Sequence, residues 1–365
     1  MLPSVPVMLW AGLILLVIVI LLLDLFVVSK RNQAVPPKKA LVMTGVFVAL
    51  GLLFSLVIYE VYQHGLMGDA ATTFAGKPMT GAAAVGEYLS VWVLEYSMSV
   101  DNLFVFTLVF AHFKVPAQHQ HRVLFWGIMG ALVFRALMIG TASSLVAAFQ
   151  PVLIVFGLIL LYTAYKMLTQ DEHYDPSKSL ALRAARLFLP VTDNLHGDRF
   201  FARHGLDDVW DKGHTGKPLK VGALMATPLF LVLCVVEATD IVFAVDSVPA
   251  AFGQSRTTFI IFAANVFAIL GLRSLYFAIA SLISAFRYLK IALAVVLIFI
   301  GIKMVLTPPL KFIPTGTDAA GNPTHWQGLH IETAWSLGVI GTCLLVGIGA
   351  SLLRKEPESA PPAAQ

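Results

Sequence analysis

Long apolar stretches separated by short polar connections dominate this chain. Nine of these stretches can cross about 30 Å of hydrocarbon at 1.5 Å per helical residue. The predicted transmembrane helices cover residues 7–28, 40–62, 86–111, 122–148, 151–168, 223–248, 257–283, 288–307 and 332–353. The pattern therefore predicts an all-α integral membrane protein with nine transmembrane helices.

The basic residues in the connections predict how the helices are oriented. The first connection carries Lys30, Arg31, Lys38 and Lys39 and no acid, so we expect it in the cytoplasm. Lys and Arg in the later connections agree with strict alternation from this starting point. We therefore predict an N-terminus on the outer side of the cell membrane and a C-terminus in the cytoplasm.

Composition and the apolar pattern together divide the chain into segments. The predicted parts are two N-terminal transmembrane helices (1–62), a first helical group (86–168), a cytoplasmic crossover (169–222), a second helical group (223–307), a C-terminal helix (332–353) and a disordered tail (356–365). The tail is rich in Pro and Ala, a composition that cannot bury enough apolar surface to fold.

Overall composition supports the membrane interpretation. The chain is 58% hydrophobic and 13% charged, whereas soluble domains are roughly 25% charged. Cys234 and Cys343 both lie in apolar stretches and are interpreted as small core residues, not as a disulfide or a metal site. We expect membrane lipid around the chain and no nucleic-acid partner, and protein partners stay open.

Five acids lie well inside two of the apolar stretches, 86–111 and 223–248: Glu95, Asp101, Glu237, Asp240 and Asp246. A carboxylate in hydrocarbon costs roughly 2.5–3.5 kcal/mol on insertion scales. Such residues must therefore face one another, an ion or a wet cavity. The pattern predicts an ion path through the membrane.

Residues 86–168 and 223–307 repeat one order of polar positions: acids, then Arg, then Lys. The matched pairs are Glu95 with Asp240, Asp101 with Asp246, Asn102 with Ser247, Arg135 with Arg273, and Lys166 with Lys303. Each unit has three crossings, so the two units are predicted to be inverted repeats. Secondary transporters use this layout, with the binding site where the repeats meet.

Helical geometry sets a condition on a shared site. Residues six apart on a regular helix point some 120° apart, so Glu95 and Asp101 do not share a face. Pro249 follows soon after Asp246 and disfavours helix at the preceding residue. We therefore expect a break or an unwound turn near Asp246.

The candidate metal ligands are all oxygen donors: Glu95, Asp101, Asn102, Glu237, Asp240, Asp246 and Ser247, with Ser99 as a possible addition. Oxygen ligands suit Mg²⁺, Ca²⁺ and Mn²⁺. Met98, one turn from Glu95, is either a further ligand that favours Mn²⁺ or a packing residue. Several acids around one dication raise one another's pKa, which gives a route to proton exchange.

The four basic residues of the repeats have two interpretations each. Arg135 and Arg273 either pair with the repeat acids or gate the site. Lys166 and Lys303 lie near helix ends and either snorkel to the interface or act as charge partners. Asp24, near Lys30 and Arg31, is either a surface or cap residue or a functional one.

Six sequence motifs carry a resemblance to a known family. They begin at Glu95 (EYSMSVDNLFV), Gln120 (QHRVLFWGI), Leu189 (LPVTD), His196 (HGDRFF), Val236 (VEATDIVFAVDSVPA) and Phe267 (FAILGLRSLYF). The chain is similar to the TerC family of integral membrane proteins, and especially to its Alx-type branch, over nearly all of residues 10–355. The resemblance implies a bacterial inner-membrane Mn²⁺ exporter of the LysE-like transporter group, with the acidic motifs as its metal site.

Three functions stay open at this stage. A secondary transporter would export Mn²⁺, or another hard cation such as Ca²⁺, by alternating access; nothing resembles a nucleotide-binding loop, so the proton gradient or the membrane potential would drive it. An intramembrane enzyme would use paired carboxylates, but the mirrored acids and bases fit ion handling better. A scaffold or sensor of a tellurite or envelope stress complex would dock partners on 169–222. We expect no enzyme activity and no catalytic cofactor.

Overall fold

A computed structural model shows a bundle of long helices with two small sheets. It describes residues 4–28, 36–68, 78–149, 151–169, 182–183, 185, 187, 190–192, 195–205, 220–279, 287–307, 310–317, 323–326 and 331–353. Residues 280–283 of one predicted helix, most of the predicted crossover 169–222 and the predicted disordered tail lie outside these ranges.

The helices follow the apolar stretches closely. They are α1 (Val5–Val28), α2 (Pro37–Gln63), α3 (Gly81–His112), α4 (Ala117–Ala148), α5 (Val152–Thr169), α7 (Pro228–Phe252), α8 (Thr258–Leu270), α9 (Leu272–Ile279), α10 (Arg287–Leu306) and α11 (Thr333–Leu353). With α8 and α9 counted as one span, nine segments of the described chain are long and apolar enough to cross a membrane. The prediction of an all-α protein with nine such helices is confirmed.

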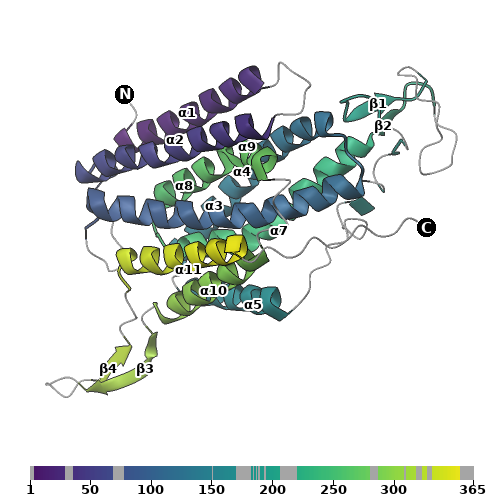
Figure 1. Cartoon of the computed structure of the whole chain (residues 1–365). Coiled ribbons are helices and arrows are strands. Elements are labelled where there is room, and N and C mark those ends of the chain that lie inside the picture. The colour runs from purple at the N-terminus through teal and green to yellow at the C-terminus, as the bar shows by residue number, and fades with distance from the viewer. Residues whose placement is uncertain are drawn as a thin grey trace.

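Two short antiparallel sheets lie at opposite ends of the bundle (Figure 1). Strands β1 (Phe201–Arg203) and β2 (Leu224–Ala226) pair at one end. Strands β3 (Leu310–Thr317) and β4 (Pro323–Trp326) pair at the other end, between α10 and α11. We refer to these as the β1–β2 end and the β3–β4 end.

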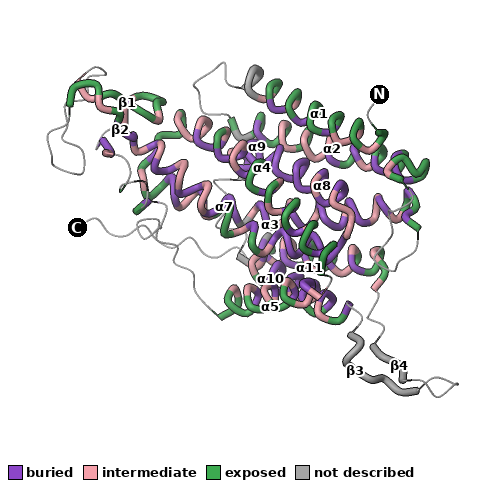
Figure 2. Tube along the Cα trace, turned by 180° about the vertical axis from the view of Figure 1, so that it is seen from behind, coloured by how far each residue is buried: buried purple, intermediate pink, exposed green. Residues whose placement is uncertain are grey.

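Helix α8 is the buried centre of the bundle. Every residue from Phe259 to Leu270 is buried except the half-buried Phe262, whereas residues 5–24 of α1 are largely exposed (Figure 2). Exposed leucines, isoleucines and valines on α1 are what a lipid-facing helix requires. Polar residues on α8 must therefore find partners inside the protein.

The predicted helix 257–283 is interrupted at Gly271, where α8 ends and α9 begins. A Cβ at Gly271 would lie 3.1 Å from the Cβ of Phe47 on α2. Glycine thus allows α2 to approach the junction closely, and its lack of a side chain weakens the helix there. The sequence pattern did not predict this break.

The break expected beside Asp246 is wrong, because α7 continues through Pro249 to Phe252. Proline removes one hydrogen bond of the helix, the one to the carbonyl of Val245. Packing compensates for this loss, since residues Ser247 to Phe252 are all buried. Such burial fixes the helix where its own hydrogen bonds are incomplete.

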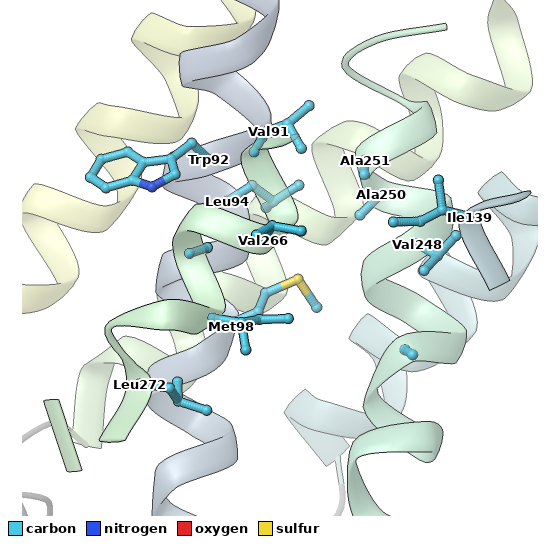
Figure 3. Packing of buried hydrophobic residues seen from close by; sticks show 14 of the residues in the cluster. Val91, Trp92, Leu94, Met98, Ile139, Val248, Ala250, Ala251, Val266 and Leu272 are labelled. Atoms are coloured by element: carbon cyan, nitrogen blue, oxygen red, sulfur yellow. The ribbon is translucent and has the colours of Figure 1, made fainter. Parts of the chain in front are cut away.

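Helices of the two predicted repeats pack across one another. Helix α3 packs on α8, α4 packs on α7, and α5 packs on α10. Val91 and Leu94 of α3, Val266 of α8, and Val248 of α7 lie in the apolar part of this core (Figure 3). This exchange is compatible with an inverted repeat, but the repeat itself and the orientation in the membrane stay predictions.

The contact between α5 and α10 brings two backbones together. A Cβ at Gly157 would lie 2.7 Å from the carbonyl oxygen of Gly301, and a Cβ at Gly301 would lie 3.0 Å from that of Gly157. Small residues at such positions let membrane helices approach closely, so that van der Waals contacts hold them together.

Gly157→Ala should lower the free energy of unfolding by about 1–3 kcal/mol, because the new methyl group meets backbone that cannot move aside. The measurement is thermal unfolding of the purified protein in detergent, followed by tryptophan fluorescence. Gly140→Ala is the matched control: its Cβ has no neighbour within 4 Å, so it should be neutral or stabilising by up to about 1 kcal/mol. Equal effects of the two substitutions would contradict the close contact.

Candidate functional site

Arg135 is the centre of a buried ion cluster. It lies on α4 and is 2% exposed. Its Nη1 donates to Oε2 of Glu95 on α3 at 2.5 Å. Its Nη2 and Nε donate to Oδ1 and Oδ2 of Asp240 on α7 at 3.1 and 3.3 Å. One guanidinium thus joins acids from both predicted repeats.

Neighbouring polar side chains complete the surroundings of this cluster. Ser247 lies seven residues after Asp240, on the same face of α7, and its Oγ is 3.5 Å from Nη1 of Arg135. Asn265 of α8 faces Glu95. Neither Nδ2 of Asn265 nor Oε1 of Glu95 makes a hydrogen bond of normal geometry to the part of the chain that is described.

Two further acids of α7 flank the cluster. The carboxylate of Glu237 lies against α4, where a Cβ at Gly130 would come within 2.0 Å of Oε1. Glycine at 130 therefore makes the space that this carboxylate occupies. Asp246 acts electrostatically on the same group of charges, through Glu95 and Arg135. Oε2 of Glu237 and Oδ1 of Asp246 are buried without a hydrogen-bond partner among the described residues.

The predicted ligands of α3 lie beside these charges. Ser99 and Asn102 are 1% and 3% exposed, and Met98 is buried as well. The sulfur of Met98 lies on the side of α3 that faces α7 (Figure 3). Asp101 lies on α3, but its side chain is outside the description, so its role stays a prediction.

The acids do not form a ready metal cage. No group of three or more His, Cys, Asp or Glu residues in the described chain has an arrangement that could hold a metal ion. Arg135 takes the place between Glu95 and Asp240 instead. The donor set of carboxylate, amide and hydroxyl oxygens fits a hard cation, but such a cation has to compete with the guanidinium for the same oxygens.

Arg273 has a different role from its repeat counterpart. It donates to the side chain and the backbone carbonyl of Asp24 on α1. Arg273 is 4% exposed and the side chain of Asp24 is 9% exposed. The hypothesis that Arg273 pairs with the repeat acids is therefore wrong, and Asp24 is a buried ion-pair partner, not a surface residue.

The two lysines also differ from each other. Lys303 is 3% exposed and its Nζ donates to Oγ of Ser336 on α11 at 2.9 Å, so the prediction that it snorkels is wrong. Lys166 is exposed near the end of α5, as snorkelling requires. A methionine follows each lysine in the sequence, but only Lys303 is buried.

Sequence analysis missed several polar residues of the interior, and Asn265 and Glu87 are two of them. Asn265 is 1% exposed on the buried helix α8, and Glu87 is 0% exposed near the start of α3. The signal for Asn265 was available, since it is the one amide within 258–270. Glu87 lies near a helix end, where a charge is ordinarily solvated, so its burial could not be expected.

Arg135→Met should lower the free energy of unfolding by about 3–5 kcal/mol, because it leaves two buried carboxylates without their cation. Adding Glu95→Gln and Asp240→Asn should recover most of that loss. The control is Arg122→Met at the exposed ion pair with Asp198, where about 1 kcal/mol or less is expected. Denaturation of the purified variants measures all three. A similar loss at both arginines would contradict the buried cluster.

Comparison with known proteins places the chain in a family. Residues 80–359 match the model of the integral membrane protein TerC family. The chain is 38% identical over 336 residues to a protein of Escherichia coli strain K12 named "Putative membrane-bound redox modulator Alx", covering 91% of this chain and 90% of that one. It is 39% identical over 280 residues to the chloroplastic thylakoid membrane protein TERC of Arabidopsis thaliana, covering 76% of this chain and 64% of that one.

An uncharacterized membrane protein of Myxococcus xanthus is 38% identical over 307 residues, which cover 84% of this chain and 86% of that one. No solved structure matches. The matched region contains all the residues of the Arg135 cluster, from Glu95 on α3 to Asn265 on α8. The chain is therefore a multi-pass integral membrane protein that belongs to the TerC family.

Proposed function

We propose that this protein is a secondary transporter that exports Mn²⁺ from the cytoplasm through the Arg135 cluster. In this proposal the cation binds between α3, α4, α7 and α8, and the two helical groups rearrange around it. The cell membrane of a bacterium is the proposed location, with the N-terminus outside and the C-terminus in the cytoplasm.

The observation that carries this proposal is the burial of Arg135 between Glu95 and Asp240. An ion cluster in the middle of apolar helices is expensive, and replacement by apolar residues is often neutral or stabilising. Its retention calls for a role other than stability. Charged groups inside membrane helices commonly mark ion or substrate pathways.

Arg135 supplies a mechanism for cation exchange. An arriving dication would take the oxygens of Glu95 and Asp240, and the guanidinium would move away to other acceptors. When the cation leaves, Arg135 would return and neutralise both acids. The two carboxylates are thereby paired at both stages, with the dication in one and with the guanidinium in the other, so that neither acid is left charged and alone in the membrane interior.

Glu237 and Asp246 extend this mechanism to protons. Both carry a buried oxygen without a hydrogen-bond partner in the described chain, and both lie close to other charges of the cluster. Crowded carboxylates exchange protons as the charge beside them changes. We therefore include proton exchange against the cation in the proposal.

The donor types favour Mn²⁺ over other hard cations. Oxygen donors alone would accept Ca²⁺ or Mg²⁺ as readily. The thioether of Met98, buried on the α7-facing side of α3, adds a softer donor one turn from Glu95. Soft sulfur ligands bind transition metals better than they bind Ca²⁺ or Mg²⁺, so Met98 supports Mn²⁺ as the cargo.

A second candidate function is a membrane scaffold or sensor. The β1–β2 end offers a specific surface for it, because Phe201 and Leu224 of the sheet and the nearby Val221 are exposed. Exposed apolar groups on a polar connection can dock a partner. This surface lies apart from the Arg135 cluster, so the two candidate functions can be tested separately.

Mn²⁺ efflux from proteoliposomes tests the transport proposal. Vesicles with the purified protein are loaded with Mn²⁺, and its appearance outside is followed with a quenched fluorophore. Glu95→Gln, Asp240→Asn, Asp101→Asn and Asp246→Asn should each slow efflux by about tenfold or more, since each removes a charge worth at least roughly 1.4 kcal/mol to cation binding.

Asp198→Asn is the matched control, because Asp198 is an exposed acid paired with Arg122 and should leave efflux unchanged. If vesicles with the wild-type protein release Mn²⁺ no faster than vesicles without protein, the transport proposal is contradicted and the scaffold is favoured. Folding is checked in every sample by size-exclusion chromatography.

Met98→Leu tests the identity of the cation. Leucine fills a similar volume but lacks the sulfur, so packing should change little. We expect the ratio of Mn²⁺ to Ca²⁺ efflux to fall by about fivefold or more, because the remaining donors are hard oxygens. The control is Met138→Leu on the neighbouring α4. An unchanged ratio in Met98→Leu would show that the thioether only packs.

A further inference from the structure

A second buried charge cluster lies at the β3–β4 end, around Glu87. Glu87 is 0% exposed on the first turns of α3. It acts electrostatically on Lys303 of α10, on Arg256 in the connection between α7 and α8, and on Tyr62 at the end of α2. Four chain segments therefore meet at this one carboxylate.

Close packing encloses this cluster. A Cβ at Gly86 would lie 3.5 Å from Cγ2 of Thr333, so the first turn of α11 lies against α3 beside Glu87. Ser336 of the same turn is fully buried and accepts the hydrogen bond of Lys303. On another side, a Cβ at Gly253 would lie 2.5 Å from Cγ2 of Ile300 on α10. The connection between α7 and α8 is thus pressed against the helix that carries Lys303.

Part of the connection between α7 and α8 is itself buried. Gln254 and Ser255 are 1% and 0% exposed. The amide nitrogen Nε2 and the amide oxygen Oε1 of Gln254 both lack a hydrogen-bond partner among the described residues. Burial lowers the pKa of Arg256, and the nearby carboxylate of Glu87 opposes that shift. The buried Gln254 and Lys303 and the half-buried Arg256 therefore lie together at this end.

Helices α3 and α7 both extend from the Arg135 cluster toward this cluster. On α3, Glu87 precedes Glu95 by eight residues, which is about 12 Å along the helix and about 80° around it. Gln254, in the connection two residues beyond the end of α7, follows Ser247 of that helix by seven residues. Two elements of the central site thus lead to the cluster around Glu87.

We propose that Glu87, Lys303 and Arg256 form an electrostatic lock that closes the route between the Arg135 cluster and the β3–β4 end. The lock rests on the proposed transport function, because it makes the β3–β4 end the place where the transported dication leaves the protein. The two cations beside this route repel a passing dication, and the carboxylate of Glu87 holds them there. Separation of Lys303 and Arg256 from Glu87 would remove both the barrier and the packing that depends on it.

Thiol accessibility tests the lock without any transport measurement. The background carries Cys234→Ser and Cys343→Ser, which removes both native cysteines. Ser90→Cys introduces a reporter between Glu87 and Glu95, at a position that is 0% exposed. A charged, membrane-impermeant methanethiosulfonate reagent is then added to the purified protein in lipid nanodiscs.

Glu87→Gln and Lys303→Met should each raise the labelling rate at position 90 by about tenfold, because each shifts the population toward the open end. The double exchange Glu87→Lys with Lys303→Glu keeps the two opposite charges and should return the rate toward that of the background. Lys166→Met is the matched control: it is the repeat counterpart of Lys303 but is exposed on α5, so it should not change labelling.

Unchanged labelling in Glu87→Gln and Lys303→Met would overturn the lock, while Mn²⁺ efflux that depends on Glu95 would leave the transport function intact. Faster labelling that the charge exchange does not reverse would also overturn it, since the effect would then come from lost packing. Conversely, if labelling depends on charge but no Mn²⁺ efflux is seen, the proposal that Mn²⁺ is transported would be refuted, and the lock would stand.

Discussion

The burial of one guanidinium between two carboxylates is the constraint around which this bundle is arranged. Arg135 has to reach Glu95 on α3 and Asp240 on α7 at the same time. Charges removed from water are stable only with well-placed partners. The three helices that carry them must therefore keep their register, and the small residues of α4, such as Gly130 against Glu237, make that register possible.

Helices outside the predicted repeat give the two halves different chemistry. Arg273 finds Asp24 on α1, and Lys303 finds Ser336 on α11. Their repeat counterparts, Arg135 and Lys166, have neither of these neighbours. If the halves arose from one ancestral unit, α1 and α11 are the elements that assigned separate tasks to matched residues.

Much of the fold follows from local sequence, whereas much of the site does not. The length of the apolar stretches alone predicts nine membrane helices, because the backbone N–H and C=O groups of each stretch must hydrogen-bond to one another within the bilayer. The acidic positions were found because charge is rare in such stretches. The partner of Arg273 could not be found this way, since Asp24 is 249 residues away and no pattern links the two. Lys303 was misjudged for the same reason: its burial depends on α11, not on its distance from a helix end.

The contact of Gly157 with Gly301 has a consequence for how the two halves can move. Each glycine belongs to a different predicted repeat, and their backbones touch without side chains between them. A surface of long side chains can adapt by changing rotamers, but two bare backbones cannot. Sliding of α5 along α10 would drive Val305 or Leu161 into the opposing chain. Rotation about this contact is the movement that keeps it intact, which makes the glycine pair a pivot.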